Sequence, residues 1–203
     1  CPVETWHSFY PCKECGLLFQ CCNMRGSNAP KRKSYLKKPC HCKLHVWTDG
    51  CCLDNGNPGA RGGVGVWFNF DCPKNYSGPL LSGPQTNQRA EIYAVIKALE
   101  LAIEEVHARG VEEFSDGILI HTDSKYVVEA MTEFIYKWKR NGWKTAKGFP
   151  VSNRDLLESL DELITEVENL DRMVLFQHVP REFNQEADAL SRLGASPVNE
   201  MLW

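Results

Sequence analysis

The sequence has no long hydrophobic run and almost no net charge. No apolar stretch approaches the roughly 20 residues that a membrane-spanning helix needs, so we expect no membrane association. Lysine and arginine together number 23 against 26 aspartates and glutamates, which gives a net charge of −3. Any binding of nucleic acid must therefore depend on local basic patches. The chain begins with Cys1 rather than methionine and shows no secretory signal, so we expect an incomplete N-terminus.

Cysteine is scarce beyond the first part of the chain. Seven of the ten cysteines lie at or before Cys42, and the others are Cys51, Cys52 and Cys72. A disulfide scaffold would distribute its cysteines through the whole fold. The pattern therefore predicts an intracellular protein, nuclear or cytoplasmic with a mitochondrial location left open, that carries a Cys-rich segment at its start.

Residues 1–43 form this Cys-rich head together with a basic linker. Four thiolates would suffice for a tetrahedral Zn²⁺ site, namely those of Cys12, Cys15, Cys40 and Cys42. The pairing stays open, because Cys21, Cys22, His7 and His41 are alternative ligands, and a poorly ordered tail is the other interpretation. The basic run from Lys31 to Lys38 would add nonspecific affinity for nucleic acid through phosphate contacts.

From residue 44 the pattern of apolar residues predicts an α/β domain that ends near residue 194, followed by a tail at 195–203. The predicted strands are 45–52, 64–70, 76–81, 118–122 and 173–179. The predicted helices begin at Thr86 or Asn87, Ser124, Phe134, Ser152 or Asn153, and Asn184. Three strands followed by helix, strand, helices, strand and helix indicate a mixed sheet with helices packed on it.

Four acidic residues stand out by their places in these elements: Asp49, Glu91, Asp123 and Asp188. Asp49 lies midway along the first strand and Asp123 just past strand 118–122, so their carboxylates face each other if the strands are neighbours. Glu91 and Asp188 lie in the first turns of their helices, where single acids are common. Two unit charges about 4 Å apart repel by roughly 4 kcal/mol at an effective dielectric of about 20, and a divalent cation reverses the sign. All four acids together predict a carboxylate cage for a divalent metal and phosphodiester chemistry.

In these positions the chain resembles the type 1 ribonucleases H, and the resemblance covers about Leu44 to Gly194. The matching segments are WTDGCC, GGVGVWF, QTNQRAEIYA, HTDSKYV, NGWKTAKG and HVPREFNQEADALS. The resemblance implies a ribonuclease H-like α/β fold, with a five-stranded mixed sheet and helices on both faces. It also implies a hydrolase, an endonuclease that cleaves the RNA strand of RNA–DNA hybrids and leaves 5′-phosphate and 3′-hydroxyl ends.

For the metal site, the resemblance implies that Asp49, Glu91, Asp123 and Asp188 are catalytic and hold two Mg²⁺ ions, for which Mn²⁺ would substitute. One ion would orient and activate a water for in-line attack, and the other would stabilise the leaving 3′ oxygen. The resemblance also implies that the partner is an RNA–DNA hybrid duplex, that the protein binds it as a monomer, and that no membrane is involved.

For the RNA strand, the resemblance implies contacts to the 2′-hydroxyl, the group that separates RNA from DNA at a given site. These contacts come from the loop after the first strand and from the start of the first helix, at Cys51, Cys52, Asn55, Asn87 and Gln88, with Glu91 also in contact. Amide side chains both donate and accept, which suits a hydroxyl. The alternative is that Asn55 only makes a turn and Asn87 only caps a helix, and both roles are compatible with RNA contact.

For the DNA strand, the resemblance implies a basic protrusion formed by Lys137, Trp138, Lys139, Arg140, Asn141, Gly142, Trp143, Lys144 and Lys147. Its cations would attract phosphates and Trp143 would pack against a deoxyribose, whereas Trp138 would pack the protrusion onto the body. Thr86 and Asn153 would form a DNA-phosphate pocket. Some family members carry an arginine where this chain has Pro84, which predicts a weaker pocket.

The loop before the last helix departs from many family members, because it is shortened to PREFN. Many members carry a histidine in this loop, proposed to aid proton transfer or product release. We expect Arg181 or Glu182 to replace it in part, and we assign no catalytic role to His178, a strand residue. Two other interpretations stay open: a noncatalytic hybrid sensor, which the intact set of four acids disfavours, and a fragment of a retroelement enzyme.

Overall fold

The structure is a computed structural model that describes residues 43–109 and 117–197 together with two short strands, β1 (Phe9–Pro11) and β2 (Leu18–Gln20). Strands β1 and β2 pair in antiparallel fashion, and β2 contacts the first strand of the main sheet. The predicted zinc ligands Cys12, Cys15, Cys40 and Cys42 lie outside the described residues. The zinc site and the limits of the head therefore stay predictions.

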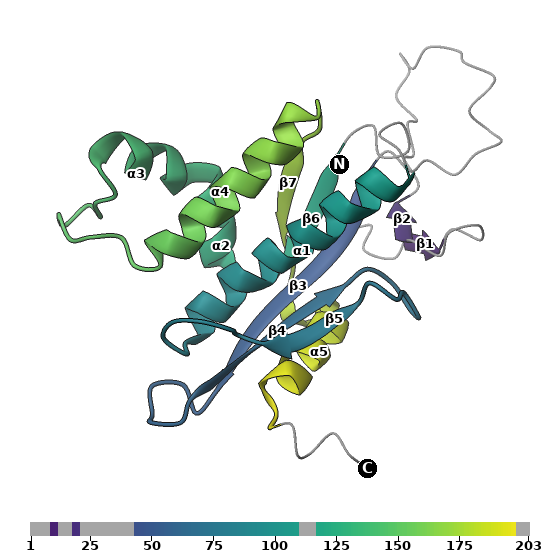
Figure 1. The fold of residues 1–203 in the computed structure, drawn as a ribbon, viewed down its shortest axis with the longest axis horizontal. Helices are drawn as coiled ribbons and strands as arrows, with labels where there is room; N and C mark the ends of the chain where they lie inside the picture. Colours follow the sequence, from purple (N-terminus) through teal and green to yellow (C-terminus); the bar gives the residue numbers. More distant parts are fainter. Residues whose placement is uncertain (1–8, 12–17, 21–42, 110–116, 198–203) are drawn as a thin grey trace.

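The main sheet has five strands, whose bounds are β3 (Leu44–Leu53), β4 (Arg61–Trp67), β5 (Tyr76–Pro79), β6 (Ile118–Thr122) and β7 (Val174–His178). Their order across the sheet is β5-β4-β3-β6-β7 (Figure 1). The pairs β5–β4 and β4–β3 are antiparallel, whereas β3–β6 and β6–β7 are parallel. The predicted five-stranded mixed sheet is confirmed, with β3 at its centre.

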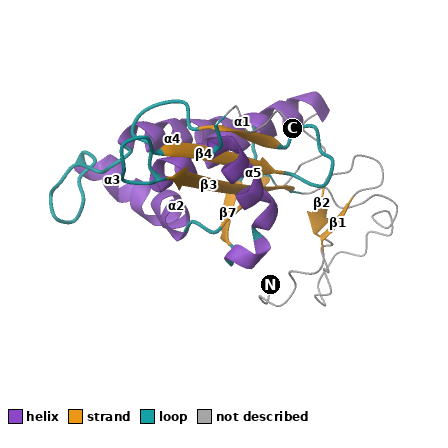
Figure 2. Ribbon diagram, turned by 90° about the horizontal axis from the view of Figure 1, so that it is seen from below, coloured by secondary structure: helices purple, strands orange, loops and turns teal. Residues whose placement is uncertain are grey.

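The helices are α1 (Asn87–Arg109), α2 (Lys125–Glu129), α3 (Ile135–Asn141), α4 (Arg154–Asn169) and α5 (Gln185–Ala195). Helices α1 and α4 pack together on one side of the sheet and α5 packs on the other (Figure 2). A π-helical segment, Ala130–Phe134, joins α2 to α3, and this link was not predicted. Within the described parts of the chain, no helix is long and apolar enough to cross a membrane.

The main hydrophobic core lies between the sheet and α1. Alternate residues of β3 and β6 point into it, including Val46 and Ile120, and they meet Leu99 of α1 and Leu157 of α4, all of them fully buried. Period-two alternation in the strands and a continuous apolar stripe on the helices make this layer possible. The core fixes α1 against β3, and it thereby sets where the acidic residues of both elements lie.

The opposite face of the sheet takes α5 at unusually close range. A Cβ atom placed on Gly65 of β4 would lie 2.2 Å from the carbonyl oxygen of Ala187 and 2.6 Å from the backbone nitrogen of Ser191. A Cβ on Gly63 would lie 2.0 Å from the Ser191 carbonyl oxygen. Since only glycine leaves room for this approach, the backbone of α5 rests directly on the backbone of β4.

Candidate active site

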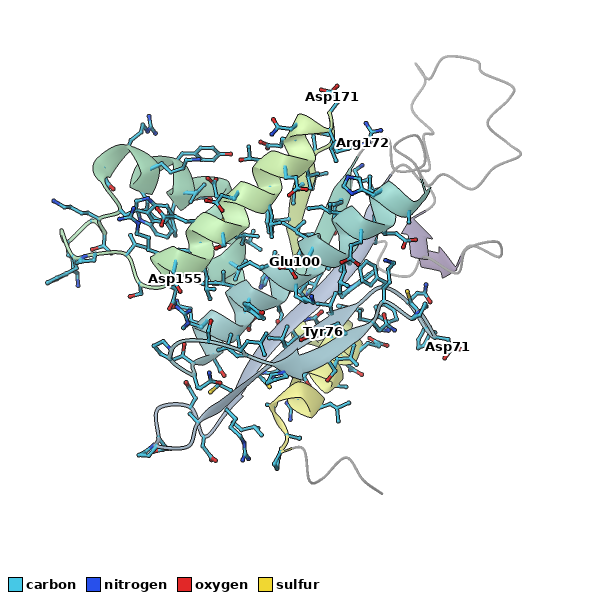
Figure 3. All side chains as sticks on the ribbon, viewed as in Figure 1. Asp71, Tyr76, Glu100, Asp155, Asp171 and Arg172 are labelled. Atoms are coloured by element: carbon cyan, nitrogen blue, oxygen red, sulfur yellow. The ribbon has the colours of Figure 1, made fainter. Side chains whose placement is uncertain are left out.

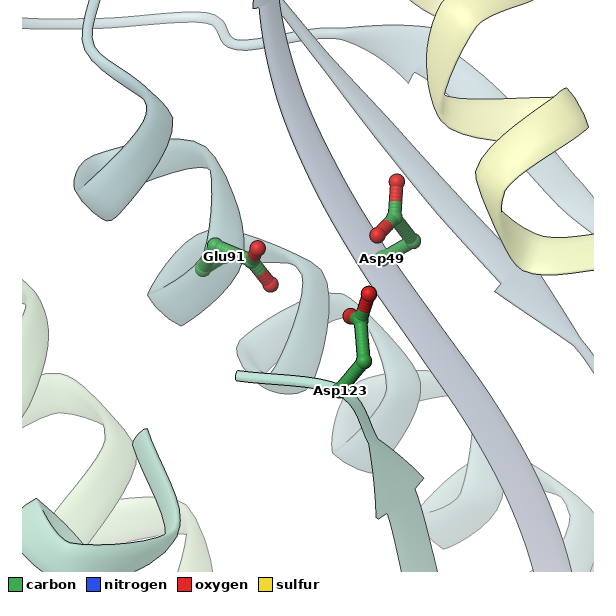
Figure 4. Close-up of side chains that lie close together, drawn as sticks. All are labelled: Asp49, Glu91 and Asp123. Atoms are coloured by element: carbon green, nitrogen blue, oxygen red, sulfur yellow. The ribbon is translucent and has the colours of Figure 1, made fainter. Parts of the chain in front are cut away.

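Three carboxylates from three different elements converge at the C-terminal end of the parallel strands. Asp49 comes from β3, Asp123 follows the end of β6, and Glu91 comes from α1 (Figure 4). The ligand oxygens of these three residues lie within 4.8 Å of one another. Thr48 pairs with Thr122 in the parallel register, and Asp49 and Asp123 are the next residue of each chain segment. The two aspartates therefore lie side by side, as the sequence predicted.

Gly50 brings α1 close enough for Glu91 to join the aspartates. A Cβ on Gly50 would lie 2.1 Å from the carbonyl carbon of Ala90 and 2.1 Å from the nitrogen of Glu91, so the strand touches the helix backbone. The backbone N–H of Gly50 also donates a hydrogen bond to the Glu91 carboxylate. Helix α1 begins at Asn87, which makes Glu91 its fifth residue, just past the first turn where the sequence placed it.

The cluster carries a large electrostatic cost that a cation would relieve. Burial raises the pKa of Asp49 from 3.8 to about 6; a hydrogen bond from Ser191 opposes this rise, and the charges of Asp123 and Asp188 add to it. Burial, followed by the charges of Asp49 and Asp123, raises the pKa of Glu91 well above its ordinary value. Oε2 of Glu91 is buried and has no hydrogen-bond partner in the described part of the chain. A divalent cation bound by oxygen ligands would satisfy that atom and offset the repulsion, so these residues suit Mg²⁺ or Mn²⁺.

Asp188, the fourth predicted ligand, lies in the first turn of α5 beside the cluster and is held by two arginines. Arg181 Nη2 donates to its Oδ1 at 2.9 Å, and Arg192 Nε donates to its Oδ2 at 2.8 Å. Burial alone would raise the pKa of Asp188, but the hydrogen bonds from Arg181 and Arg192 outweigh it and lower the pKa. Asp188 is near enough to raise the pKa of Asp49, although it is not one of the three converging acids.

Helix α5 also hydrogen-bonds two of the clustered acids, which the sequence reasoning missed. Ser191 Oγ donates to Oδ2 of Asp49. Asn184 Nδ2 donates to the carbonyl oxygen of Thr48 at 3.0 Å and to Oδ1 of Asp123 at 3.3 Å. We expected Asn184 to cap α5; it occupies the N-cap position but makes no side-chain capping bond, because its side chain points into the site. The available signal was a serine on the apolar stripe of α5 and an asparagine at its N-cap, both of them buried.

The residues predicted to contact the RNA strand lie on two adjacent elements. Cys51 and Cys52 lie near the end of β3 and are partly buried, and Asn55 lies in the exposed turn that follows the strand. Asn87 and Gln88 form the exposed start of α1. The close contact at Gly50 joins these two elements, so all five predicted residues lie on the side of the acidic cluster formed by β3 and α1.

The two residues of the predicted phosphate pocket, Thr86 and Asn153, directly precede α1 and α4. Thr86 Oγ1 accepts a hydrogen bond from the backbone N–H of Arg89 at 3.3 Å and so caps α1. Asn153 donates to Gln88 Oε1 at 3.1 Å, and its Oδ1 accepts a hydrogen bond from Arg89 Nη1 at 3.4 Å. The buried Arg89 donates to both carboxylate oxygens of Asp155 at the start of α4, at 2.9 and 2.7 Å. The structure therefore brings Thr86 and Asn153 together, with Arg89 as the link.

The predicted basic protrusion consists of α3 and the loop to residue 150. Gly142 ends α3 in the left-handed conformation, and Lys139 pairs with Asp161 of α4 at 2.6 Å. The remaining cations of the protrusion are exposed: Lys137, Arg140, Lys144 and Lys147. Trp143 is only 8% exposed and belongs to the core, with the Arg154 guanidinium 5.3 Å from its ring centroid, whereas Trp138 is only partly buried. The predicted DNA contact of Trp143 thus has little surface available, and Trp138 has more.

Comparisons with known proteins agree with this geometry. The chain matches the family model for RNase H over residues 41–196. It is 38% identical over 157 residues to a ribonuclease H of Schizosaccharomyces pombe. That match covers 77% of this chain and 54% of the relative, so the chain spans about half the length of this relative. A ribonuclease H of Parvibaculum lavamentivorans is 37% identical over 156 residues, covering 76% of this chain and 93% of that protein. Among solved structures, the foamy viral protease-reverse transcriptase in complex with an RNA/DNA hybrid has a similar fold, with a TM-score of 0.58 and 22% identity over 84% of this chain and 22% of that chain.

Proposed function

The chain belongs to the ribonuclease H family, and from this membership we propose that it hydrolyses the RNA strand of RNA–DNA hybrids with divalent cations. The observation that carries the proposal is the convergence of Asp49, Glu91 and Asp123, whose ligand oxygens lie within 4.8 Å of one another. The bacterial relative supports it further, because the matched region makes up 93% of a protein that is named ribonuclease H.

In this proposal the three clustered acids and Asp188 hold two Mg²⁺ ions. The bound ions would polarise the scissile phosphate and activate the attacking water, and the products would carry 5′-phosphate and 3′-hydroxyl ends. The protein residues contribute by fixing the carboxylates before substrate arrives: Gly50 holds Glu91, Ser191 holds Asp49, and Asn184 holds Asp123. Such preorganisation removes the need to rearrange charged groups during the reaction.

We propose that Arg181 takes the place of the histidine in the longer loop of other family members. Its guanidinium lies 2.9 Å from Asp188 and is close enough to lower the pKa of both Asp49 and Glu91. A cation in this position would stabilise the negative charge that gathers on the phosphate during attack. Glu182, the other candidate, is exposed and carries the wrong sign for that task.

The two strands of the hybrid would be recognised by neighbouring groups of residues that meet at the start of α1, where Asn153 hydrogen-bonds Gln88. The RNA strand would meet Cys51, Cys52, Asn55, Asn87 and Gln88 where β3 adjoins α1. The DNA strand would meet the pocket of Thr86 and Asn153 and then the exposed cations of the protrusion, including Lys144. Because Trp143 is buried, we propose that Trp138 makes the deoxyribose contact and that Trp143 holds the protrusion to the body.

The test is cleavage of a labelled RNA–DNA hybrid in Mg²⁺, with RNA–RNA duplex and single-stranded RNA as substrate controls. Asp123→Asn removes one clustered carboxylate, and Asp71→Asn is its matched control, because Asp71 is an exposed acid in a turn far from the site (Figure 3). We expect cleavage of the hybrid alone, abolished in Asp123→Asn and retained in Asp71→Asn. If the wild-type protein binds the hybrid but cuts it with neither Mg²⁺ nor Mn²⁺, the catalytic proposal is overturned and a noncatalytic hybrid sensor takes its place.

A further inference from the structure

We propose that Ser191 is a positioning residue of the metal site, whose hydroxyl fixes the carboxylate of Asp49 so that one chosen oxygen faces the cation. The inference rests on the proposed function in one respect, namely that a divalent cation binds at the acidic cluster. It concerns a residue of α5 that is neither a metal ligand nor a substrate contact.

The Ser191 hydroxyl has two oxygen acceptors within reach, and the Cys51 sulfur is a third, weaker hydrogen-bond neighbour. Ser191 Oγ lies within hydrogen-bond distance of Asp49 Oδ2 and 2.9 Å from the carbonyl oxygen of Asp188. A hydroxyl donates only one proton, so the two acceptors compete. The Asp188 carbonyl already has the backbone N–H four residues further along α5, and a bond to an ionised carboxylate is roughly twice as strong as one to a neutral acceptor. Ser191 therefore donates to Asp49 whenever that carboxylate is ionised, which is the state that binds a cation.

The position of the hydroxyl is fixed by the close packing of α5 on the sheet. The backbone of Ser191 touches β4 at Gly63 and Gly65, where no side chain would fit. Ser77 of β5 adds a hydrogen bond from its Oγ to the Leu190 carbonyl oxygen at 2.7 Å. Ser191 is fully buried, so no water competes for the bond. The backbone of Ser191 cannot shift unless the whole helix shifts, and the hydrogen bonds of its Oγ to Asp49 and Asp188 favour one side-chain rotamer, which is what a positioning group requires.

The bond divides the two oxygens of Asp49 between two tasks. Figure 4 shows one oxygen directed towards Glu91 and Asp123, while the other is directed away from them, on the side of α5. Ser191 occupies Oδ2, so the carboxylate offers its remaining oxygen to a cation and cannot rotate freely. Loss of a hydrogen bond that orients a metal ligand typically weakens metal binding by about 10- to 100-fold. We therefore expect removal of the Ser191 hydroxyl to weaken cation binding by about tenfold or more.

The experiment measures binding of Mn²⁺ to the full chain without substrate, by electron paramagnetic resonance of the free ion. Binding that persists in Asp123→Asn is subtracted, because it belongs to other parts of the chain. Ser191→Ala removes the hydroxyl, and Ser191→Cys keeps the volume but offers only a weak donor. Ser77→Ala is the matched control, since it removes a hydrogen bond that holds α5 without touching any of the acids.

We expect both Ser191 variants to bind Mn²⁺ about tenfold more weakly than the wild type, and Ser77→Ala to stay within about twofold. Three results would overturn the positioning role while leaving the proposed function intact: unchanged binding in Ser191→Ala, normal binding in Ser191→Cys alone, or an equal loss in Ser77→Ala. The last two would assign the effect to packing or to the docking of α5. If the wild type itself binds no more Mn²⁺ than Asp123→Asn, the metal site and the proposed function fail together.

Discussion

Replacement of Asp49 by asparagine should stabilise the metal-free protein at pH 8, although it removes a proposed metal ligand. Burial is the main reason that the pKa of Asp49 is raised from 3.8 to about 6. The folded state therefore binds this proton more tightly than the unfolded chain does, so stability is lost as the pH rises from 3.8 to about 6, and the full penalty applies above pH 6. Since one pKa unit corresponds to about 1.4 kcal/mol, the penalty at pH 8 is about 3 kcal/mol. Asparagine carries no charge and avoids the penalty, while its side-chain oxygen still accepts the bond from Ser191.

The assay is urea unfolding of the wild type and of Asp49→Asn in the presence of a chelator, at pH 8 and at pH 4. The gain of the variant should be about 3 kcal/mol at pH 8, should shrink as the pH falls through 6, and should be below about 1 kcal/mol at pH 4. The direction follows because the wild-type carboxyl is protonated in the folded state below pH 6 and in both states below 3.8. Asp71→Asn, an exposed change, should show no such gain at either pH.

Addition of Mg²⁺ at pH 8 provides the second half of this test. A cation that binds only the folded wild type raises its free energy of unfolding by mass action, so the gap to Asp49→Asn should close. The reasoning is refuted if, in the chelator, the variant is less stable than the wild type at pH 8. That result would mean that the buried carboxylates are mutually stabilised by the protein itself and leave no electrostatic cost for a cation to relieve.

Three further predictions follow from the same structure. Trp138→Ala should weaken binding of an RNA–DNA hybrid by about 1–3 kcal/mol in a titration while leaving the melting temperature nearly unchanged, whereas Trp143→Ala should destabilise the fold by about 3–5 kcal/mol; the opposite pattern would restore Trp143 as the sugar contact. Burial, followed by the charge of Lys43, lowers the pKa of His45 from 6.5 to about 4, so the wild type should lose stability as the pH falls from 6.5 to 4. In urea unfolding over that pH range, the free energy of unfolding should fall by about 3 kcal/mol less in His45→Gln than in the wild type. Gly65→Ala should destabilise the protein by about 3 kcal/mol in the same assay because the added methyl group meets the α5 backbone, and a neutral result would show that α5 does not rest on β4.

The elements could be predicted because their signals are local. Alternating apolar residues indicated the strands, capping residues and apolar stripes indicated the helices, and the structure confirms the five-stranded mixed sheet. The convergence of Asp49 with Asp123 also followed from the sequence, because both lie at the same end of neighbouring parallel strands. The π-helical segment between α2 and α3 did not follow, since it replaces one helical hydrogen-bonding pattern by another without changing the apolar stripe.

Side-chain direction was harder to predict than position. Trp138 and Trp143 lie five residues apart in one basic segment, and the backbone is left-handed at both Gly142 and Trp143, where the chain turns and Trp143 enters the core. Asn184 looked like an ordinary helix cap, yet its amide reaches Asp123 because the short loop places it directly beneath the end of β6. Both cases depend on tertiary contacts between segments that are far apart in the sequence, and no local pattern reports those contacts.

The position of α5 has a larger effect on the acidic cluster than the single acid it carries would suggest. Asp188 is one proposed ligand, but Ser191 hydrogen-bonds Asp49 and Asn184 hydrogen-bonds Asp123, so three interactions of the site depend on one helix. The glycines of β4 let the helix backbone contact the strand backbone, and even an added methyl group at Gly63 or Gly65 would clash with α5. Cation binding and the docking of α5 should consequently be linked, because each favours the same arrangement of Asp49 and Asp123. On this view the glycines of GGVGVW matter to the chemistry, since the close approach they permit keeps the acids in place.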